Sequence, residues 1–341
     1  MKFGVYIPSQ HPATRDPGAM LAEQVDFVHW VRDLGWDSLW SGQHFLTEEI
    51  SHMSTIVTLT RLAVEAGDME LGIGLLLLPL LNPVEVAEHV ASLGVVTGGR
   101  LIVGVGVGYR DEEYAAFGVP KSEAGKRFSA NVKILRSLLS GEPTDADLPW
   151  CTLRGATLSV RPPRIPELWI GANADVAVRR AARLADAWLI NPHAPLSTIT
   201  RQRKLFDDER ARVGLPQPRQ TPLFREVFCA PRSEDAHELA QRYLGAKYQR
   251  YTAWGQADVL PDDDTFEGPF GELAAQRFVI GNPEECLEIL NSWRSAIGVN
   301  HFILRAHWAG MPFEKAKTSV RLLAQEVFPH LRELEDEERV W

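Results

Sequence analysis

The sequence predicts an α/β protein folded as a closed (β/α)8 barrel, that is, a TIM barrel. Along its 341 residues, short apolar segments alternate with longer amphipathic ones about eight times. The short segments are rich in Val, Ile and Leu, which is typical of parallel strands that are buried on both faces. Alternation of strand and helix predicts a parallel sheet, and its even repetition favours a closed barrel over an open sheet.

We expect a strand wherever a short, mostly apolar run lies between turn-forming residues, because such runs are typical of buried strands. The expected strands are Lys2–Pro8, Asp37–Ser41, Leu71–Leu78, Leu101–Val105, Leu168–Gly171, Trp188–Ile190, Pro222–Cys229 and His301–Arg305.

Amphipathic segments between the strands predict the helices. Gly35, Gly67 and Gly141 follow three of them, and glycine is the residue that most often ends a helix. The expected helices are Pro17–Leu34, Ser54–Ala66, Pro83–Val96, Glu123–Leu139, Asp175–Leu184, Glu234–Tyr248, Pro283–Ala296 and Phe313–Phe328.

Nothing in the sequence divides the chain, so we expect one domain over residues 1–341. We find no short-period repeat, low-complexity tract or clear linker. Two longer segments interrupt the alternation: Glu142–Pro166 after the fourth strand is rich in proline, and Gly255–Gly271 before the eighth strand is acidic. Segments of this length in a barrel are commonly lids or side hairpins.

Composition excludes several classes of partner. A net charge of −9 and a pI near 5.6 argue against binding to nucleic acid or an anionic membrane. Cys151, Cys229 and Cys286 are odd in number and far apart, as expected of buried thiols in a reducing compartment. The first residues turn polar too soon for a signal peptide, and no apolar run has membrane-spanning length. We therefore expect a cytoplasmic protein without a membrane partner.

The segment Gly98–Tyr109 (GGRLIVGVGVGY) is the most informative local pattern. A buried strand runs into alternating glycines, which leave space between the backbone and whatever lies at the strand's end. A dinucleotide-binding motif would need glycine where Tyr109 stands and a helix directly after it. Instead we expect the polar segment Arg110–Glu113 to be a loop. The pattern favours a glycine-lined strand end that accepts a flat ligand.

Active sites of barrels lie at the C-terminal ends of the strands, and this rule ranks the polar residues. His44 follows the second strand directly, with Gln43 before it and the apolar Phe45 after it. Imidazole exchanges protons near neutral pH, so His44 is our candidate catalytic residue. No His-x-His pair lies on the first strand, and we expect no metal site.

Six segments in order carry a resemblance to the bacterial luciferase-like flavin monooxygenase family, over nearly the whole chain. They are MKFGVYIP, LGWDSLWSGQHF, LGIGLLLLPLLNPVEVAEHVASL, GGRLIVGVGVGYRDEEYAAFG, ELWIGANADVAVRRAARLADAW, and RFVIGNPEECLEIL with HFILRAHWAGM. The resemblance implies a luciferase-like barrel that holds reduced FMN, or in sister groups the deazaflavin F420, at the strand C-termini.

The resemblance implies an FMNH2-dependent monooxygenase of a two-component system. The reduced flavin adds O2 to form a C4a-peroxide, which attacks a small organic substrate. A separate NAD(P)H:flavin reductase would supply the FMNH2, since this chain has no second nucleotide-binding motif. An F420-dependent oxidoreductase that transfers hydride, and a non-catalytic flavin-binding protein, are the alternatives. The sequence leaves open the substrate and whether the chain forms a homodimer.

Position and resemblance together assign residues to the cofactor site. Family members often have a non-proline cis peptide behind the ring, here Gly74–Leu75, and Gly72 and Gly104 also suit a flat slot. The segment Gly171–Ala174 opens a helix, whose free N–H groups suit a phosphate. The assigned cofactor-binding residues are Gly74, Leu75, Asn82, Gly106, Tyr109, Arg127, Gly171, Ala172, Asn173 and Ala174.

The chain departs from the family's pattern at three positions near this site. Ala174 stands where the family usually has a hydroxyl residue, and Val107 where luciferase has an arginine. Gln43 replaces an acidic residue that often precedes the histidine.

Arg225 and Trp254 are our candidate substrate-binding residues. The role of Arg225 is open, since it points either into the pocket or at a carboxylate such as Glu226. Tyr251, Phe266 and Phe270 are further aromatic residues that would cover an apolar substrate or pack on the barrel rim.

Overall fold

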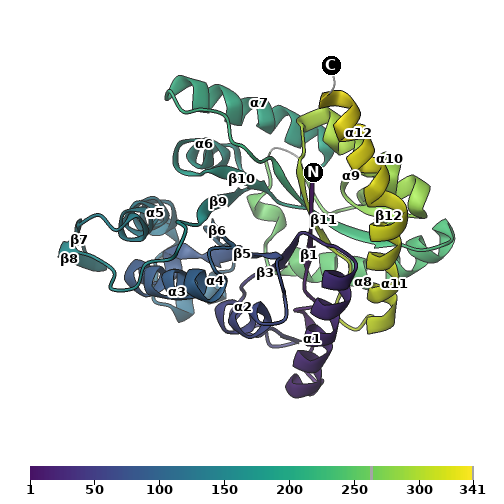
Figure 1. Ribbon diagram of the computed structural model, residues 1–341, viewed down its shortest axis with the longest axis horizontal. Coiled ribbons are helices and arrows are strands. Elements are labelled where there is room, and N and C mark those ends of the chain that lie inside the picture. The colour runs from purple at the N-terminus through teal and green to yellow at the C-terminus, as the bar shows by residue number, and fades with distance from the viewer. Residues whose placement is uncertain (262–263, 340–341) are drawn as a thin grey trace.

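The computed structural model describes residues 1–261 and 264–339 and shows the expected closed barrel (Figure 1). Strands gather at the centre and helices surround them. Residues 262–263 of the second insertion, and residues 340–341, lie outside the described part of the chain.

In that part, eight parallel strands form the barrel. In spatial order they are β1 (Lys2–Tyr6), β3 (Ser38–Ser41), β5 (Glu70–Leu77), β6 (Leu101–Gly106), β9 (Glu167–Ala172), β10 (Ala187–Ile190), β11 (Pro222–Cys229) and β13 (His301–Arg305). The pairing of Ile190 with Leu223 joins β10 to β11, and Val5 pairs with Leu304 between β1 and β13, so the sheet closes. The second half of β11 pairs with an extra strand, β12 (Val279–Gly281).

The longer helices pack around these strands. They are α1 (Pro17–Asp33), α2 (Thr55–Ala63), α3 (Pro83–Val96), α5 (Ala124–Ser140), α6 (Asp175–Leu184), α7 (Leu196–Arg212), α8 (Ser233–Ala253), α10 (Pro283–Ile297), α11 (Phe313–Leu322) and α12 (Phe328–Arg339). Gly141 ends α5 with φ 82°, in the left-handed conformation that favours glycine. None of the helices described is both long and apolar enough to cross a membrane.

The sequence analysis missed α7 and was wrong about the segment after β6. Helix α7 buries the polar side chains of Gln202, Glu209 and Arg210 beside two apolar ones, so its inner face has no clear hydrophobic periodicity. The expected polar loop at 110–113 instead enters α4 (Asp111–Ala116), whose first turn is wholly acidic. Carboxylates there stabilise a helix N-terminus. The helix expected over Phe313–Phe328 is divided by a π-helical turn, Leu323–Val327.

The described parts of the two insertions form short elements of their own. The first contains the antiparallel hairpin of β7 (Thr144–Leu148) and β8 (Cys151–Ala156), which lies beyond α5 (Figure 1). The second contains a short helical turn, Ala257–Val259, and leads into α9 (Phe270–Arg277). A further pair of two-residue strands, β2 (His11–Pro12) and β4 (Ile50–Ser51), ties the loop after β1 to the loop after β3.

A polar chain crosses the barrel interior among large aromatic side chains. Trp40 Nε1 donates to Ser38 Oγ at 2.9 Å, and Ser38 Oγ lies 2.9 Å from His301 Nε2. His301 Nδ1 donates to Gln220 Oε1 at 2.8 Å. Burial lowers the pKa of His301 to about 3, so the ring is neutral and each nitrogen has a partner. Trp40 also stacks on Trp169 with ring centroids 5.3 Å apart, which fills the interior.

Gly72 allows Trp40 to pack, and its substitution is a test of this interior. A Cβ at Gly72 would lie 2.2 Å from Trp40 Cδ2, and Trp40 is fully buried. We expect Gly72→Ala to lower the free energy of unfolding by about 1–3 kcal/mol through overpacking. Gly271→Ala on α9 is the matched control, because its Cβ meets nothing within 4 Å. Urea unfolding of both variants measures the effect. Equal stability of the two would contradict this packing.

Candidate active site

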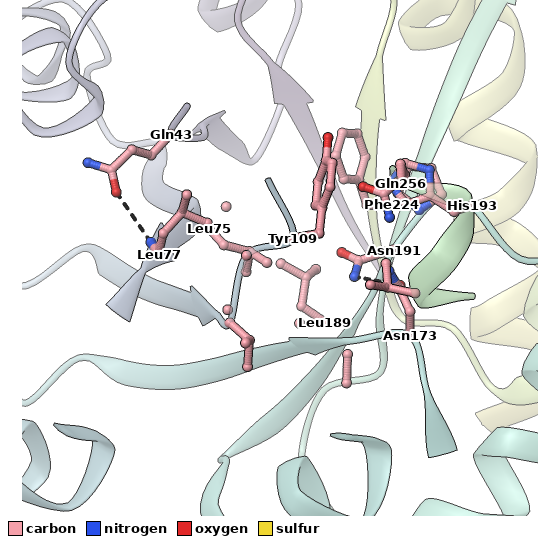
Figure 2. Close-up of a pocket in the computed structure, with 18 of the residues that line it drawn as sticks. Gln43, Leu75, Leu77, Tyr109, Asn173, Leu189, Asn191, His193, Phe224 and Gln256 are labelled. Carbon is pink, nitrogen blue, oxygen red and sulfur yellow. Dashed lines mark hydrogen bonds between the residues drawn. The ribbon is translucent and has the colours of Figure 1, made fainter. Parts of the chain in front are cut away.

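A cavity of about 280 Å³ opens at the C-terminal ends of the barrel strands. The sequence-based candidates His44, Gly74, Gly106, Tyr109 and Asn173 all line it, although they follow different strands. Figure 2 shows Leu75 and Leu189 between Gln43 on one side and Asn173 with Asn191 on the other. The barrel therefore brings residues from distant parts of the sequence to one rim.

The floor of the cavity is the Gly74–Leu75 segment of β5. Its peptide bond is cis, as the resemblance implies. Tyr6 Oη donates to Gly74 O at 3.0 Å, and the backbone N–H of Gln43 donates to Leu75 O at 3.3 Å. The Gln43 side-chain oxygen accepts from the Leu77 N–H at 3.2 Å (Figure 2). Gln43 thus holds the floor through hydrogen bonds.

Glycines beside the floor make room for the side chain of Leu75. A Cβ would lie 2.8 Å from Leu75 Cδ1 at Gly106, and 2.4 Å from it at Gly171. The result is an apolar platform of Leu75 at the centre of the cavity. Gly72 and Gly104 lie outside the cavity lining. Gly104 makes room for the backbone of β5, where a Cβ would lie 2.3 Å from Ile73 O.

One end of the cavity contains the N-terminus of α6. Residues Gly171, Ala172, Asn173 and Ala174 line the cavity, and Ala174 is the N-cap but makes no side-chain cap bond. The first N–H groups of a helix have no intrahelical partner, so they are available to an anion. Asn173 is fixed, because its Oδ1 accepts from Asn191 Nδ2 at 2.9 Å (Figure 2).

Asp175, the first residue of α6, is neutralised by neighbours. Its carboxylate accepts from Arg201 at 2.6 Å and from Gln202 Nε2 at 2.9 Å. Hydrogen bonding and charge from Arg201, with help from Gln202, lower the pKa of Asp175. The carboxylate therefore repels an anion at this helix end less than its position suggests.

Arg180 on α6 is a cavity residue that the sequence analysis did not select. Its guanidinium lies near the start of α5, 2.9 Å from where a Cβ of Gly125 would be. Among the side chains that the structure describes, those of residues 1–261 and 264–335, no carboxylate forms an ion pair with it. By contrast, Arg127 lies outside the cavity lining: its Nε donates to Glu123 at 3.0 Å, and its guanidinium covers the Trp150 ring at 4.5 Å.

His44 lies on the opposite side, against a buried carboxylate. Its Nδ1 is 3.4 Å from Glu113 Oε1, which also accepts from the Phe45 N–H at 2.9 Å and faces Arg110 at 3.5 Å. Burial alone would raise the pKa of Glu113, but His44, the Phe45 N–H and Arg110 outweigh burial and lower it. An ionised Glu113 fixes the orientation of the imidazole. Glu113 lies on α4, the helix that the sequence analysis took for a loop.

The candidate substrate residues Arg225 and Trp254 do not line the cavity. Trp254 borders it, with its ring 5.8 Å from that of His44. Arg225 Nη1 donates to Asn191 O at 2.7 Å, and its guanidinium lies 3.8 Å from the centroid of Trp293 on α10. Burial lowers the pKa of Arg225 to about 9.

Asn82 and two of the lid candidates also lie elsewhere. Asn82 is exposed and caps α3 by accepting from the Val84 N–H at 2.9 Å. Phe266 packs on Tyr248 at 4.9 Å, and Phe270 packs near Phe278 at 6.2 Å. Among the lid candidates, Tyr251 lines the cavity.

Arg305, the last residue of β13, lines the other end of the cavity, where β10 and β11 separate β13 from β9 and the α6 that follows it. The sequence analysis missed Arg305. Its guanidinium covers Tyr6 at 3.9 Å and Phe224 at 4.9 Å. The rule that selected His44 also points to Arg305, since both stand at strand C-termini. His52 also lines the cavity, and no sequence signal pointed to it; burial lowers its pKa to about 3.

The model of the luciferase-like monooxygenase family matches residues 1–301 of the chain. The chain belongs to this family. This membership agrees with the resemblance in the sequence and makes the protein an oxidoreductase of the luciferase-like class.

Two relatives match nearly the full length of the chain. The chain is 25% identical to 4-hydroxyprotoasukamycin monooxygenase of Streptomyces nodosus subsp. asukaensis, over 96% of this chain and 92% of that one. It is 21% identical to the oxygenase component of flavin-dependent trigonelline monooxygenase of Acinetobacter baylyi, over 98% and 96%.

Solved structures show the same fold with two different cofactors. The oxygenating constituent of 3,6-diketocamphane monooxygenase of Pseudomonas putida, in complex with FMN, aligns with TM-score 0.81 at 17% identity, over 96% of this chain and 98% of that one. An F420-dependent secondary alcohol dehydrogenase, in complex with an F420-acetone adduct, aligns with TM-score 0.77 at 16% identity, over 96% and 98%. The luciferase-like fold thus accommodates either cofactor.

Proposed function

We propose that the protein is an FMNH2-dependent monooxygenase of a two-component system, which uses O2 to oxidise a small organic substrate. The observation that carries the proposal is the cavity itself. It joins an apolar platform, built on Gly74 and Leu75, to a helix N-terminus with an arginine that has no carboxylate partner among the described residues. A flat apolar ring and a phosphate together would satisfy both parts.

The residues present fit FMN. The ring would lie on the Leu75 platform, and the phosphate would bind at the first turn of α6, beside Asn173 and Arg180. A helix N-terminus and a guanidinium are both well suited to bind phosphate. Arg180 supplies the charge that the sequence analysis assigned to Arg127. When bound, reduced FMN supplies the electrons with which O2 is activated.

The chain's own residues would bind, orient and handle protons. Glu113 orients His44, whose Nε2 is then the nitrogen that exchanges a proton with the ligand. Tyr109 covers the cavity with a buried hydroxyl that has no partner within the described residues. Burial raises its pKa well above the usual value, so the hydroxyl keeps its proton and would donate it in a hydrogen bond to a bound ligand. Closure by these side chains excludes water.

A separate NAD(P)H:flavin reductase is the partner in this proposal. The trigonelline enzyme is named as an oxygenase component, which supports a division of labour in the family. The glycine-rich segment 98–109 lacks the dinucleotide-binding spacing, so the chain would receive its flavin already reduced. A cytoplasmic location remains a prediction from the sequence, and the homodimer remains open.

Anaerobic titration tests the proposal against its alternatives. We expect reduced FMN to bind more tightly than oxidised FMN, because a diffusing reduced flavin must be captured and the oxidised product released. F420-dependent hydride transfer is the second candidate, since a relative of the same fold binds F420. Preference for F420 would favour that candidate. Tight flavin binding with no substrate oxidation in the presence of O2 would indicate a non-catalytic flavin-binding protein.

Substitution of Arg180 and of Arg127 should affect FMN affinity differently. We expect Arg180→Ala to weaken FMN binding about 10- to 100-fold, the loss of a charged hydrogen bond worth roughly 1.5–3 kcal/mol. Riboflavin, which has no phosphate, should bind the variant nearly as well as it binds the parent protein. Arg127→Ala is the matched control and should leave both affinities unchanged. Fluorescence titration with both ligands measures this. An equal loss of affinity for riboflavin would show that Arg180 does not bind the phosphate.

His44→Ala should impair turnover far more than flavin binding. A positioned proton-transfer group contributes about 10²–10⁴-fold in rate, whereas one hydrogen bond contributes about 1 kcal/mol to affinity. Steady-state turnover of a substrate and anaerobic FMN titration give the two numbers. The exposed His89 on α3 provides the control, His89→Ala. Turnover by His44→Ala near that of the control would leave His44 as a packing residue.

A further inference from the structure

Among the described residues, cationic side chains line the cavity and no carboxylate does. Among the described residues that line it, Arg180 and Arg305 are the charged side chains beside three histidines, and none is Asp or Glu. If α6 and Arg180 bind the flavin phosphate, Arg305 is not needed for it. A second negative group is therefore expected at the Arg305 end.

A buried cluster behind this end carries one excess positive charge. Lys247 on α8 pairs with Glu226 on β11, and Arg305 Nη1 lies 3.6 Å from the same carboxylate oxygen. The other oxygen of Glu226 accepts from Trp308 Nε1 at 2.6 Å. All three charged side chains are less than one-tenth exposed (3%, 0% and 8% for Lys247, Glu226 and Arg305). Two cations share one carboxylate, and a buried uncompensated charge is costly, so a further anionic oxygen is favoured here.

Tyr251 on α8 is the group placed to provide that oxygen in the free protein. Its hydroxyl accepts from Gln10 Nε2 at 3.0 Å, and the positive charge of Arg305 acts on it. Both groups are donors, so in the described part of the chain the phenolic proton has no acceptor. Tyr251 also lines the cavity, where a ligand can reach it.

Electrostatics separate Tyr251 from the other buried tyrosines around it. Burial would raise its pKa, but Lys247, Arg305 and the Gln10 hydrogen bond outweigh burial and lower it. Burial raises the pKa of Tyr6 to about 12, and it raises those of Tyr109 and Tyr248 well above the usual value.

The other titratable groups near Tyr251 come from several elements. Glu226 on β11 opposes the lowered pKa, whereas Arg305 on β13 and Lys247 on α8 produce it. The rings of His44, after β3, and His193, after β10, face Tyr251 at 6.3 Å and 6.1 Å. Burial and nearby cations lower the pKa of His193 well below its usual value, so that ring adds no charge.

We propose that Tyr251 accepts the proton from a phenolic or enolic hydroxyl of the substrate, and that the substrate oxyanion so formed is bound beside Arg305. The inference rests on the proposed function for the identity of this ligand as substrate. The tyrosinate oxygen takes the proton, the substrate O–H bond breaks, and its electron pair stays on the substrate oxygen. One negative charge faces the cation cluster before and after the transfer.

This chemistry selects a phenol or enol over a carboxylic acid. A phenolic hydroxyl has a pKa of about 10 and needs a base at neutral pH, whereas a carboxylic acid with a pKa of about 4 arrives ionised. Deprotonation makes the conjugated carbons of a phenol or enol electron-rich, which suits them to oxidation by activated oxygen. The substrate class is therefore a small, largely apolar molecule with one phenolic or enolic hydroxyl.

Proton counting with two matched probes tests the proposal. We use 2-naphthol, which has a phenolic hydroxyl, and 2-naphthoate, which is already an anion. Each is titrated calorimetrically into the FMN-loaded protein in buffers of different ionisation enthalpy, at several pH values between 6 and 9 (about the range below the phenolic pKa). The variants are Tyr251→Phe, Arg305→Gln and the control Tyr243→Phe on the same helix, with thermal unfolding to verify that each is folded.

We expect naphthoate to take up protons on binding, rising toward about one per site with increasing pH, because Tyr251 is reprotonated. Tyr251→Phe should abolish this uptake, while Tyr243→Phe retains it. With naphthol, the parent protein should exchange almost no proton with buffer, whereas Tyr251→Phe should release about one. Arg305→Gln should weaken naphthoate binding at least tenfold.

Equal proton counts for the parent protein and Tyr251→Phe would overturn the role of Tyr251 as the base. Unchanged naphthoate affinity in Arg305→Gln, or failure of both probes to bind, would overturn the anion site. Repeating the titrations without FMN separates this proposal from the flavin one. If the protein binds no flavin but the proton counts hold, the proposed function fails and the acid–base site stands.

Discussion

Closure of the parallel sheet is the constraint on which the whole site depends. Pairing of β10 with β11, and of β13 with β1, brings eight strand C-termini to one rim. Without that closure, His44 and Arg305, which are 261 positions apart in the sequence (305 − 44), would have no reason to share a cavity. Backbone hydrogen bonds between strands thus bring together residues that are distant in the sequence. The stacked side chains of Trp40 and Trp169 fill the barrel interior and stabilise this arrangement.

The two ends of the cavity both carry positive charge, but in different surroundings. At one end, an uncapped helix and Arg180 offer donors to an anion at the surface of the barrel top. At the other, Arg305 and Lys247 share Glu226 and act on Tyr251 in a nearly dry environment. Low dielectric strengthens such interactions, so the second end is suited to moving a proton and the first to binding. The apolar Leu75 platform lies in the same cavity.

The sequence predicts the barrel because short apolar strands alternate regularly with amphipathic helices along the chain. It also predicts His44 and the Gly171–Ala174 helix start from their places at strand ends, whereas the Gly74–Leu75 cis peptide came from the family resemblance. It fails where direction in space decides. Arg127 and Arg180 are both helical arginines, and only the packing of α5 against α6 shows which one faces the cavity. Helix α7 was not predicted because its buried face is largely polar. Arg225 was wrongly expected to bind substrate, because alternation along β11 points it away from Phe224 and toward Trp293.

A crystal structure of the protein with bound FMN tests the central claim most directly. The account predicts the isoalloxazine ring on the Leu75 platform and the phosphate at the first turn of α6, within hydrogen-bond distance of Arg180. Phosphate bound at Arg305, or a ring away from Leu75, would contradict it. Phosphate at Arg305 would also assign the cation cluster to the cofactor and remove the argument that it binds a substrate oxyanion.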